Sequence, residues 1–442
     1  MTYPVLALIG STNVGKSTLF NRLTRMRDAL VADSPGLTRD RHYAHVTWYG
    51  HHFIAVDTAG IVTHPGSDID RITHDQSSLA IDEADVIFFM VDGRCGLTAE
   101  DYSIAADIRK KEKIVFLVVN KTEGGQGFVL AAEFFSLGFG NAIPISAAHG
   151  DGVNDLMDRM IKSLPSHFDL SAKLDTSDVP RFAVIGQPNT GKSTFINSLL
   201  GEDRVVVSPK SGTTRDAIAI DFFYKDHRYE LIDTAGVRRR HKVTDKIEKL
   251  SVIKTLQAVH SCDVALLFID ANHGITVQDL HLSGYLAEEG RAVVIVVNKW
   301  ELLDICQRKK FKELLKNQLY FFDFAAICYI SALSARGIFD VMNKAQSVYD
   351  SAHRHFSTSK LTRALMKAVS NQSPPRSGFS RPKLRYAHQG GHNPPLIVIH
   401  GNSTQFVSDT YKRYLSRFFR KHFHIEGVPL RIEFKGSENP YV

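Results

Sequence analysis

Two nine-residue stretches constrain the fold of this 442-residue chain most strongly: GSTNVGKST at residues 10–18 and GQPNTGKST at residues 186–194. Each has the spacing G-x-x-x-x-G-K-S and follows an apolar run with the composition of a strand. Such a loop points main-chain amide groups at phosphates, while its lysine reaches the outer phosphates and its serine ligates Mg²⁺. The chain is therefore predicted to hold two phosphate-binding loops, each between a strand and a helix.

The surroundings of the two loops are also repeated. HFIAVDTAG at residues 52–60 recurs as RYELIDTAG at residues 228–236, with the offset that separates the loops, and KIVFLVVNK at 113–121 matches RAVVIVVNK at 291–299. Short runs rich in Val, Ile and Phe alternate with stretches of helical period. Apolar runs of this kind are typical of strands buried on both faces, so each copy is predicted to be a doubly wound α/β domain. In the first copy the strands are expected near residues 5–9, 53–56, 86–91, 114–119 and 142–145.

The rest of the chain divides into a linker and a third domain. Residues 165–179 are polar, flanked by proline and without periodicity, which indicates a linker. After residue 349 the pattern predicts a helix, two strands, a helix and a strand, a small α+β module. We thus expect α/β domains at residues 1–164 and 180–349, with the module at 350–442.

The formal net charge of +7 is concentrated in the C-terminal module. Residues 351–442 hold 15 Lys and Arg but only 4 Asp and Glu. A basic module beside near-neutral domains favours a polyanionic partner, most often nucleic acid. In the helix expected at residues 408–423, four basic residues share one face opposite an apolar stripe, and they are predicted to contact RNA, although a solvated basic face would look the same. They are Arg413, Arg417, Arg420 and Lys421.

Composition excludes several other classes of protein. No stretch approaches the roughly 18 uninterrupted apolar residues of a membrane span, and the N-terminal residues lack the basic region of a secretory signal. The four cysteines form no CxxC pair and no metal-ligand spacing, which fits reduced thiols. We expect a cytoplasmic protein that spans no membrane and does not bind DNA.

Three further groups in the first copy are placed to act on a bound nucleotide. Asp57 ends an apolar strand, where its carboxylate can join Ser17 in the Mg²⁺ shell. Thr38 lies in a segment that could close over the metal, or in an ordinary polar surface loop, and Gly60 can bring its amide to a γ-phosphate. The corresponding residues of the second copy are Asp233, Ser193, Thr214 and Gly236.

Two motifs are positioned to read a nucleotide base: NKTE at residues 120–123 and NKWE at residues 298–301. Each is followed later in its copy by a Ser-Ala pair, at residues 146–147 and 331–332. With the loops and DTAG, this set resembles translation-factor-type GTPases. The tandem copies, GVRRRHKV after the second DTAG and KLRYAHQGGHNPPLIVIHGN in the tail resemble the bacterial Der (EngA) family over essentially the whole chain. The resemblance implies a GTP-hydrolysing switch in assembly of the large ribosomal subunit, with GTP or GDP and Mg²⁺ as cofactors, ribosomal RNA as partner and a KH-like C-terminal domain.

Residue by residue, the resemblance predicts one GTP site in each copy. The first site comprises Gly10, Ser11, Thr12, Asn13, Val14, Gly15, Lys16, Ser17, Thr18, Asp57, Thr58, Ala59, Gly60, Ile61, Asn120, Lys121, Thr122, Glu123, Ser146 and Ala147. The second comprises Gly186, Gln187, Pro188, Asn189, Thr190, Gly191, Lys192, Ser193, Thr194, Asp233, Thr234, Ala235, Gly236, Val237, Asn298, Lys299, Trp300, Glu301, Ser331 and Ala332. Residues expected to assist hydrolysis are Lys16, Thr38, Gly60, Lys192, Thr214 and Gly236.

The chain departs from the family pattern in a few places. Both base motifs end in Glu where the family has Asp, which keeps the charge but lengthens the reach, while Ser11 and Thr12 differ at positions whose side chains need not touch phosphate. The residue after DTAG is Ile or Val, so no glutamine positions water. Related GTPases with this replacement often use K⁺, and Asn13 and Asn189 stand where its ligand would be, although either asparagine could simply stabilise the loop. The tail lacks the GxxG of RNA-binding KH domains.

Two other functions fit parts of the sequence. A metabolic P-loop ATPase or kinase would need a pocket for a second substrate, which the sequence does not suggest. An RNA-binding scaffold could retain nucleotide-stabilised but inactive domains. Competition between ATP and GTP tests the first alternative, and phosphate release under saturating GTP tests the second.

Overall fold

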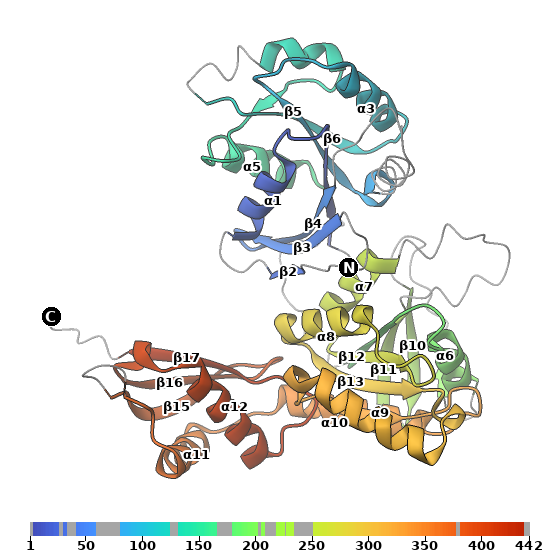
Figure 1. Ribbon diagram of the computed structural model, residues 1–442, viewed down its shortest axis with the longest axis vertical. Helices are drawn as coiled ribbons and strands as arrows, with labels where there is room; N and C mark the ends of the chain where they lie inside the picture. Colours follow the sequence, from blue (N-terminus) through green and yellow to red (C-terminus); the bar gives the residue numbers. More distant parts are fainter. Residues whose placement is uncertain are drawn as a thin grey trace. The chain divides into compact units, whose positions relative to one another are not determined.

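The computed structural model describes most of the chain, which divides into two compact units, Met1–Thr176 and Ser177–Val442. Each unit is described by itself (Figure 1). The domain limits expected from the sequence remain predictions. All statements below concern the described residues, which are 3–25, 30–32, 41–58, 80–123, 131–165, 179–201, 205–207, 218–225, 227–233, 251–376 and 381–436.

The first unit is built on one mixed sheet of the order β2-β3-β4-β1-β5-β6-β7. Five strands run parallel, whereas β3 pairs antiparallel with β4 and β2 pairs antiparallel with β3. The five strands expected from the sequence are present. The bounds are β1 Val5–Ile9, β2 Leu30–Ala32, β3 Arg41–Trp48, β4 His51–Thr58, β5 Val86–Asp92, β6 Ile114–Asn120 and β7 Ile143–Pro144.

Helices cover both faces of this sheet (Figure 1). Leu19 and Phe20 of α1 and Leu156 and Met160 of α5 share one core with side chains of β1, β5 and β6. Ile108 of α3 is fully buried outside that cluster. Helices on both faces of a mainly parallel sheet define the doubly wound fold expected for this copy. The bounds are α1 Lys16–Arg25, α3 Ala99–Arg109, η1 Glu133–Leu137 and α5 Val153–Ser163.

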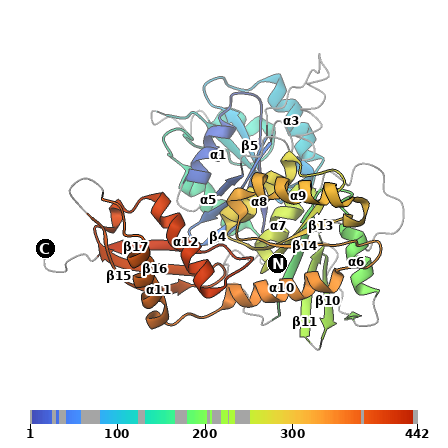
Figure 2. The same cartoon turned by 60° about the horizontal axis from the view of Figure 1, so that its bottom comes forward.

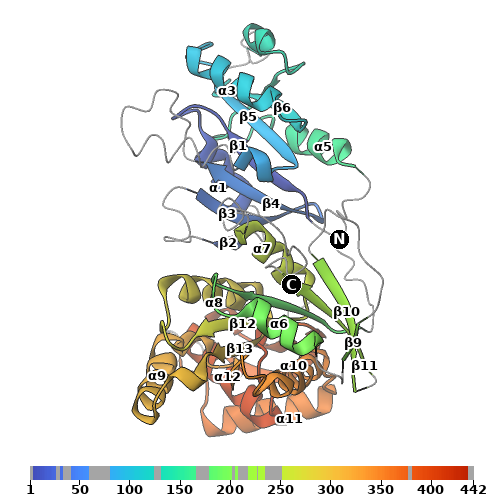
Figure 3. The same ribbon diagram turned by 90° about the vertical axis from the view of Figure 1, so that its right-hand side faces the viewer.

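The second unit repeats the same sheet in the order β14-β13-β12-β8-β11-β10-β9. Here β10 and β11 form the antiparallel hairpin, with β9 beside β10 at the sheet edge (Figure 3). Strand bounds are β8 Arg181–Gly186, β9 Val205–Val207, β10 Ile218–Tyr224, β11 His227–Asp233, β12 Val264–Asp270, β13 Ala292–Asn298 and β14 Ala326–Tyr329. Helical bounds are α6 Lys192–Leu200, α7 Ser251–Ser261, α8 Val277–Glu289, η3 Trp300–Leu302, α9 Ile305–Gln318, η4 Tyr320–Phe322 and α10 Ile338–His353.

The same capping box begins α3 and α8. The Thr98 hydroxyl accepts from the Asp101 amide while the Asp101 carboxylate accepts from the Thr98 amide, and Thr276 and Asp279 repeat both bonds. Such boxes satisfy two amides that a helix start otherwise leaves unpaired. The repeat therefore extends from the motifs to the way helices are started.

The C-terminal module has the expected order of helix, two strands, helix and strand. Its sheet runs β15-β16-β17, with β15 antiparallel and β17 parallel to β16 (Figure 2). The bounds are α11 Thr358–Asn371, β15 Lys383–Gly391, β16 Leu396–Asn402, η5 Thr404–Phe406, α12 Asp409–Phe423 and β17 Arg431–Gly436. Tyr411, Leu415 and Phe419 of α12 are buried, as its apolar stripe predicts.

The module and the second α/β domain share one hydrophobic core. That cluster runs from Phe182 of β8 through Val348 of α10 to Leu415 of α12 and Ile432 of β17. The Val293 amide donates to the Gly427 carbonyl at 2.7 Å, and the Gly427 amide to the Phe324 carbonyl at 2.6 Å. The two domains are therefore fused into one unit, in which α10 leads from one to the other (Figure 2).

All four cysteines are free, with Cys95 and Cys306 exposed and Cys262 and Cys328 buried. Among the described residues, no helix is both long enough and apolar enough to cross a membrane.

Candidate nucleotide-binding sites

The first phosphate-binding loop connects β1 to α1. Lys16 is 5% exposed, and its Nζ donates to the carbonyls of Gly10 at 3.2 Å and Ser11 at 2.7 Å. Burial lowers the pKa of this amine to about 8, although the Asp57 and Glu100 carboxylates act to raise it. An anion bound in the loop would stabilise the charged lysine, so this chemistry fits a phosphate.

Asn120, at the end of β6, ties this loop to the base-recognition region. Its Nδ2 donates to the Val14 carbonyl at 2.8 Å, and its Oδ1 accepts from the Ala147 amide at 2.9 Å. Gly15 has φ +98°, and a Cβ there would collide with the Asn120 amide. Glycine is required here both for its backbone conformation and for the close approach of the Asn120 side chain.

Lys121 and Glu123 are held by partners of opposite charge. Lys121 Nζ donates to Asp92 Oδ2 at 2.5 Å and to the Asn13 carbonyl at 2.8 Å. Although burial acts to raise it, the Lys121 hydrogen bond and the Arg94 amide lower the pKa of Asp92. Glu123 accepts from the Ser146 hydroxyl at 2.9 Å and from Arg94 at 2.8 Å. The expected base-reading carboxylate is thus pre-positioned by two donors.

Asp57 and Ser17 remain the predicted Mg²⁺ ligands of the first site. In the β1–β4 pairing, Asp57 is beside Leu8, close in sequence to the Gly10 that opens the loop. Asp57 is 3% exposed, while Ser17 is the second residue of α1 and is exposed. A carboxylate and a hydroxyl are ligands that Mg²⁺ accepts, so the donor set fits this ion.

The second site reproduces these contacts. Lys192 Nζ donates to the Gly186 carbonyl at 2.8 Å and also to that of Gln187, and it is 8% exposed. Asn298 Nδ2 donates to the Thr190 carbonyl at 2.8 Å, and Asn298 Oδ1 accepts from the Ala332 amide at 2.9 Å. Gly191 has φ +91° and faces the Asn298 amide as Gly15 faces Asn120. The same scaffold is therefore built twice.

The two base motifs differ in their third residue, Thr122 or Trp300, and in the contacts of the final glutamate. Glu301 is exposed and, within the described part of the chain, has no hydrogen-bond partner corresponding to Ser146 or Arg94. Trp300 instead packs against Tyr329, with ring centroids 4.4 Å apart, while the Arg308 guanidinium lies 5.6 Å from the Trp300 ring. The second site therefore presents a less constrained carboxylate beside a large aromatic ring.

Sequence reasoning missed Asp92 and Asp270. Asp270 accepts from Lys299 Nζ at 2.6 Å, as Asp92 accepts from Lys121. These aspartates end β5 and β12, where Asp92 pairs with Asn120 and Asp270 with Asn298 across the sheet. The available signal was an aspartate at the end of a repeated apolar strand, but only the register places it beside the lysine.

Several predicted site residues lie outside the described residues. For Asp233 the backbone is described and the side chain is not. The others outside are Thr38, Ala59, Gly60, Ile61, Thr214, Thr234, Ala235, Gly236 and Val237.

The four basic residues predicted to contact RNA are not equivalent. Arg413 and Lys421 are exposed. Arg417 and Arg420 instead pair with Asp323 of the second α/β domain, with N–O distances of 3.2 and 2.7 Å, and the Arg420 side chain is only 13% exposed. Part of the basic face therefore holds the module to its neighbouring domain.

The structure has two phosphate-binding loops, and each is hydrogen-bonded by the asparagine of its own base motif within a doubly wound sheet. This arrangement defines a P-loop GTPase with two nucleotide-binding domains in tandem. The model of the 50S ribosome-binding GTPase family matches residues 5–121 and 181–299, and that of the KH-domain-like C-terminal region of EngA bacterial GTPases matches residues 355–435. The chain belongs to the GTPase Der (EngA) family.

Relatives named GTPase Der match along the full length. The one from Aromatoleum aromaticum is 49% identical over 439 residues, covering 99% of this chain and 99% of its own. The one from Nitrosospira multiformis is 50% identical, covering 99% of this chain and 94% of its own. A solved structure of an Aquifex aeolicus Era variant bound to GDP.AlF4- matches 48% of this chain and 74% of its own at 24% identity, with a TM-score of 0.33. That structural match has low coverage and a low TM-score, and the family membership does not rest on it.

Proposed function

We propose that this GTPase acts in the cytoplasm as a switch in assembly of the large ribosomal subunit, with ribosomal RNA as partner. The proposal is carried by the duplicated phosphate-binding site. Lys16 and Lys192 donate to the carbonyl of the first glycine of their loops, and Asn120 and Asn298 each donate to a carbonyl of the same loop. Two sites give four combinations of GTP and GDP states. A γ-phosphate that binds one domain arrangement more tightly than another would couple the sites, typically by about 1 to 3 kcal/mol.

The residues of each site have separate roles in this proposal. Lys16 and Lys192 orient the outer phosphates, and Glu123 and Glu301 accept the two guanine donors. Ser17 and Asp57 would hold Mg²⁺ in the first site, as Ser193 and Asp233 would in the second, and the ion would neutralise charge on the phosphates. Thr38 and Thr214 would close over the metal, and the amides of Gly60 and Gly236 would donate to the γ-phosphate.

Paired lysine variants test this proposal. We expect Lys16→Ala and Lys192→Ala each to abolish nucleotide binding at its own site and to change association with ribosomal particles. Binding is measured by titration with fluorescent GDP, and association by co-sedimentation with GTP, GDP or a non-hydrolysable analogue. Lys309→Ala, at an exposed position of α9, is the control.

Three results would contradict it. Displacement of GTP by equal concentrations of ATP would favour a metabolic ATPase or kinase. Absence of phosphate release under saturating GTP would favour an inactive RNA-binding scaffold. If either lysine variant bound particles like the parent in every nucleotide state, the second site would be redundant.

We also propose that K⁺ assists hydrolysis through Asn13 and Asn189. Both asparagines have left-handed backbones, with φ of 64° and 62°, so the two loops adopt the same turn. Replacing K⁺ by Na⁺ at constant ionic strength should slow hydrolysis. In the Lys192→Ala background, Asn13→Gly, which tolerates this φ, should remove the difference between the salts. Equal parental rates in K⁺ and Na⁺ would exclude the mechanism.

A further inference from the structure

The sheet of the KH-like domain has one face packed on helices and one face carrying polar and aromatic side chains. Leu384, Ala387 and Ile399 are buried in the core shared with α11 and α12. A register shift lies between Leu384 and Tyr386. Beyond it, successive side chains alternate between faces, so Tyr386, next to Ala387, and His400, next to Ile399, lie on the opposite face. Across the strands Tyr386 pairs with His400, and His400 pairs with Lys435. A phenol, an imidazole and an ammonium thus form one row over all three strands.

The rings of this row are stacked. Tyr386 and His400 are nearly parallel, at an interplanar angle of 5° and a centroid distance of 4.4 Å, and His388 stacks on His400 at 5.1 Å and 28°. Cross-strand aromatic pairs ordinarily stabilise a sheet. Tyr386 is nevertheless 44% exposed, so much of this ring surface remains available to a ligand.

The charges around the rings favour an anion beside a flat, uncharged group. Burial lowers the pKa of His400, and the nearby His388 and Lys435 act in the same direction, which favours the neutral ring. Lys383, Arg385 and Lys435 are exposed at this end of the sheet, and none of them forms an ion pair with another described residue. The acidic side chain on the same face is Glu433, beside Val398.

This row lies away from the junction with the second GTPase domain. The junction is made at the other end of the strands, where Asn393 Nδ2 donates to Asp263 at 3.4 Å and Arg431 donates to the Glu288 carbonyl at 2.9 Å. Lys435 is four residues beyond Arg431 along β17. The stacked rings are therefore not part of the contacts that hold the two domains together.

We propose that this face is a stacking platform for the bases of single-stranded RNA, with a base on Tyr386 and His400 and an adjoining phosphate at Lys435. Exposed aromatic rings on a sheet are how some RNA-binding domains hold unstacked bases, and flanking cations hold the backbone. Stacked rings beside cations favour this ligand over an acidic protein, which needs charge without planarity. The platform rests on the proposed RNA partner and would serve a domain whose sequence lacks GxxG.

The test measures binding of the full-length protein to a fluorescein-labelled 12-nucleotide single-stranded RNA and to an abasic strand of the same length. Tyr386→Leu keeps the bulk but removes the ring, and it should weaken binding of the base-containing strand about fivefold or more. It should leave binding of the abasic strand and the salt dependence unchanged. Lys435→Gln should weaken both strands and reduce the salt slope by about 0.7.

Two further variants keep the test decisive. Tyr386→Trp retains an aromatic surface and should bind at least as tightly as the parent, even if Tyr386→Leu proves unstable. Tyr102→Leu replaces a tyrosine of similar exposure, 46%, in the first GTPase domain and should bind like the parent.

The platform is overturned if Tyr386→Leu binds the base-containing strand as tightly as the parent, if it weakens the abasic strand equally, or if Tyr102→Leu has the same effect. Weaker binding by Tyr386→Trp, or displacement of RNA by polyglutamate at equal charge concentration, would also overturn it. A parent that bound no RNA would refute the proposed RNA partner together with the platform, whereas unchanged binding by Tyr386→Leu would refute the platform alone.

Discussion

Asn120 and Asn298 each serve two loops with one amide group. Each donates to the phosphate-binding loop and accepts from the Ser-Ala loop, so the groups expected to recognise phosphate and base are fixed to one another before nucleotide binds. Polar groups already held in place cost less ordering on binding. We therefore expect each empty site to be largely pre-formed around its asparagine.

The base carboxylates give a prediction that separates the two sites. Glu123→Asp and Glu301→Asp should both leave the preference for GTP over ATP intact, because each keeps the charge. Glu123→Asp should lower affinity by about 1 kcal/mol, roughly fivefold, because its shorter side chain loses its present contacts with Ser146 and Arg94. Glu301 has no such partners among the described residues, so Glu301→Asp should change the affinity for nucleotide less.

Each aspartate variant is measured by titration with fluorescent GDP, with ATP and GTP as competitors and the other site disabled by its lysine variant. Loss of guanine preference in both variants would show that these positions do not read the base in the way proposed.

At this scale, the sequence predicts residues whose role follows from a local pattern. The glycines and lysines of the loops are such residues, because the local spacing G-x-x-x-x-G-K-S defines them. Asp92 and Asp270 were not predicted, because their roles depend on register with Asn120 and Asn298, 28 residues along the chain. An aspartate after an apolar strand has many possible partners, and only the folded sheet selects one.

Among the secondary-structure elements, the apolar parallel strands were predictable, whereas the short antiparallel edge strands β2 and β9 were not. The run at Val5–Ile9 is apolar throughout and buried throughout, so its composition alone indicates a central strand. Strands β2 and β9 have three residues each, and among the described strands β2 pairs with β3 alone and β9 with β10 alone. These short segments become strands because they pair with the edges of β3 and β10. Nothing in their own sequence indicates that pairing.

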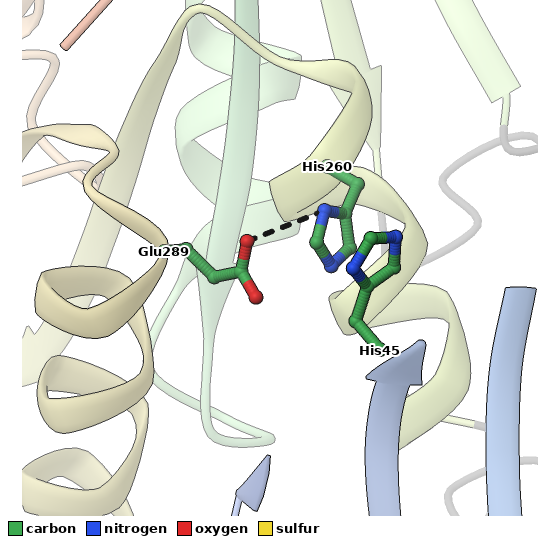
Figure 4. Close-up of side chains that lie close together, drawn as sticks. All are labelled: His45, His260 and Glu289. Atoms are coloured by element: carbon green, nitrogen blue, oxygen red, sulfur yellow. Dashed lines mark ion pairs between the residues drawn. The ribbon is translucent and has the colours of Figure 1, made fainter. Parts of the chain in front are cut away.

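Helix α8 ends in a buried carboxylate whose protonation should affect stability. His260 Nδ1 lies 3.5 Å from Glu289 Oε2, an ion pair when the histidine is protonated (Figure 4), and His260 Nε2 is 2.7 Å from the Tyr285 hydroxyl. Burial raises the pKa of Glu289 to about 7, although Arg291 and Arg431 act to lower it. The folded chain therefore keeps this proton at pH values where the unfolded chain has released it.

We expect Glu289→Gln to stabilise the protein at pH 8 but not at pH 4.5. Between pH 4.5 and 7 the folded state binds more protons at Glu289 than the unfolded state, so this group lowers the free energy of unfolding as pH rises. The variant lacks this loss and should exceed the parent by about 1 to 3 kcal/mol at pH 8. Urea unfolding of both proteins across this range measures the difference, and a constant difference would contradict the assignment.

For the whole molecule, the main finding that the sequence did not supply is the common core of the second GTPase domain and the KH-like domain. Apolar stripes, such as the one recognised in the sequence of α12, predict that a helix buries one face. They do not say against which domain, because apolar side chains such as Val348 and Leu361 have no directional preference for a partner. The charged contacts of Asp323 are likewise set by the packing of the two domains.

Asp323→Ala tests how much these charged contacts contribute. Removing Asp323 leaves Arg417 and Arg420 without this partner, and because Arg420 is mostly buried, unfolding of the second unit should become easier by about 1 to 2 kcal/mol. Asp155→Ala is the control, since it breaks an exposed ion pair with Arg159 whose loss should cost about 0.5 kcal/mol or less. Urea unfolding followed by tryptophan fluorescence measures both, and equal effects would mean that the Asp323 contacts are ordinary surface pairs.

The common core also has a consequence for the synthesis of the chain. Strand β17 contributes Ile432 to a core that begins at Phe182, so the core of the second GTPase domain cannot be completed until Ile432 has been synthesised. At about 5 to 20 residues per second, the apolar surface of α10 stays uncovered by its C-terminal partners for on the order of 5 to 20 s. The first GTPase domain carries its own core and needs no such wait. A nascent chain stalled inside the KH-like domain would thus release one finished GTPase joined to an unfinished one, a natural substrate for chaperones and proteases.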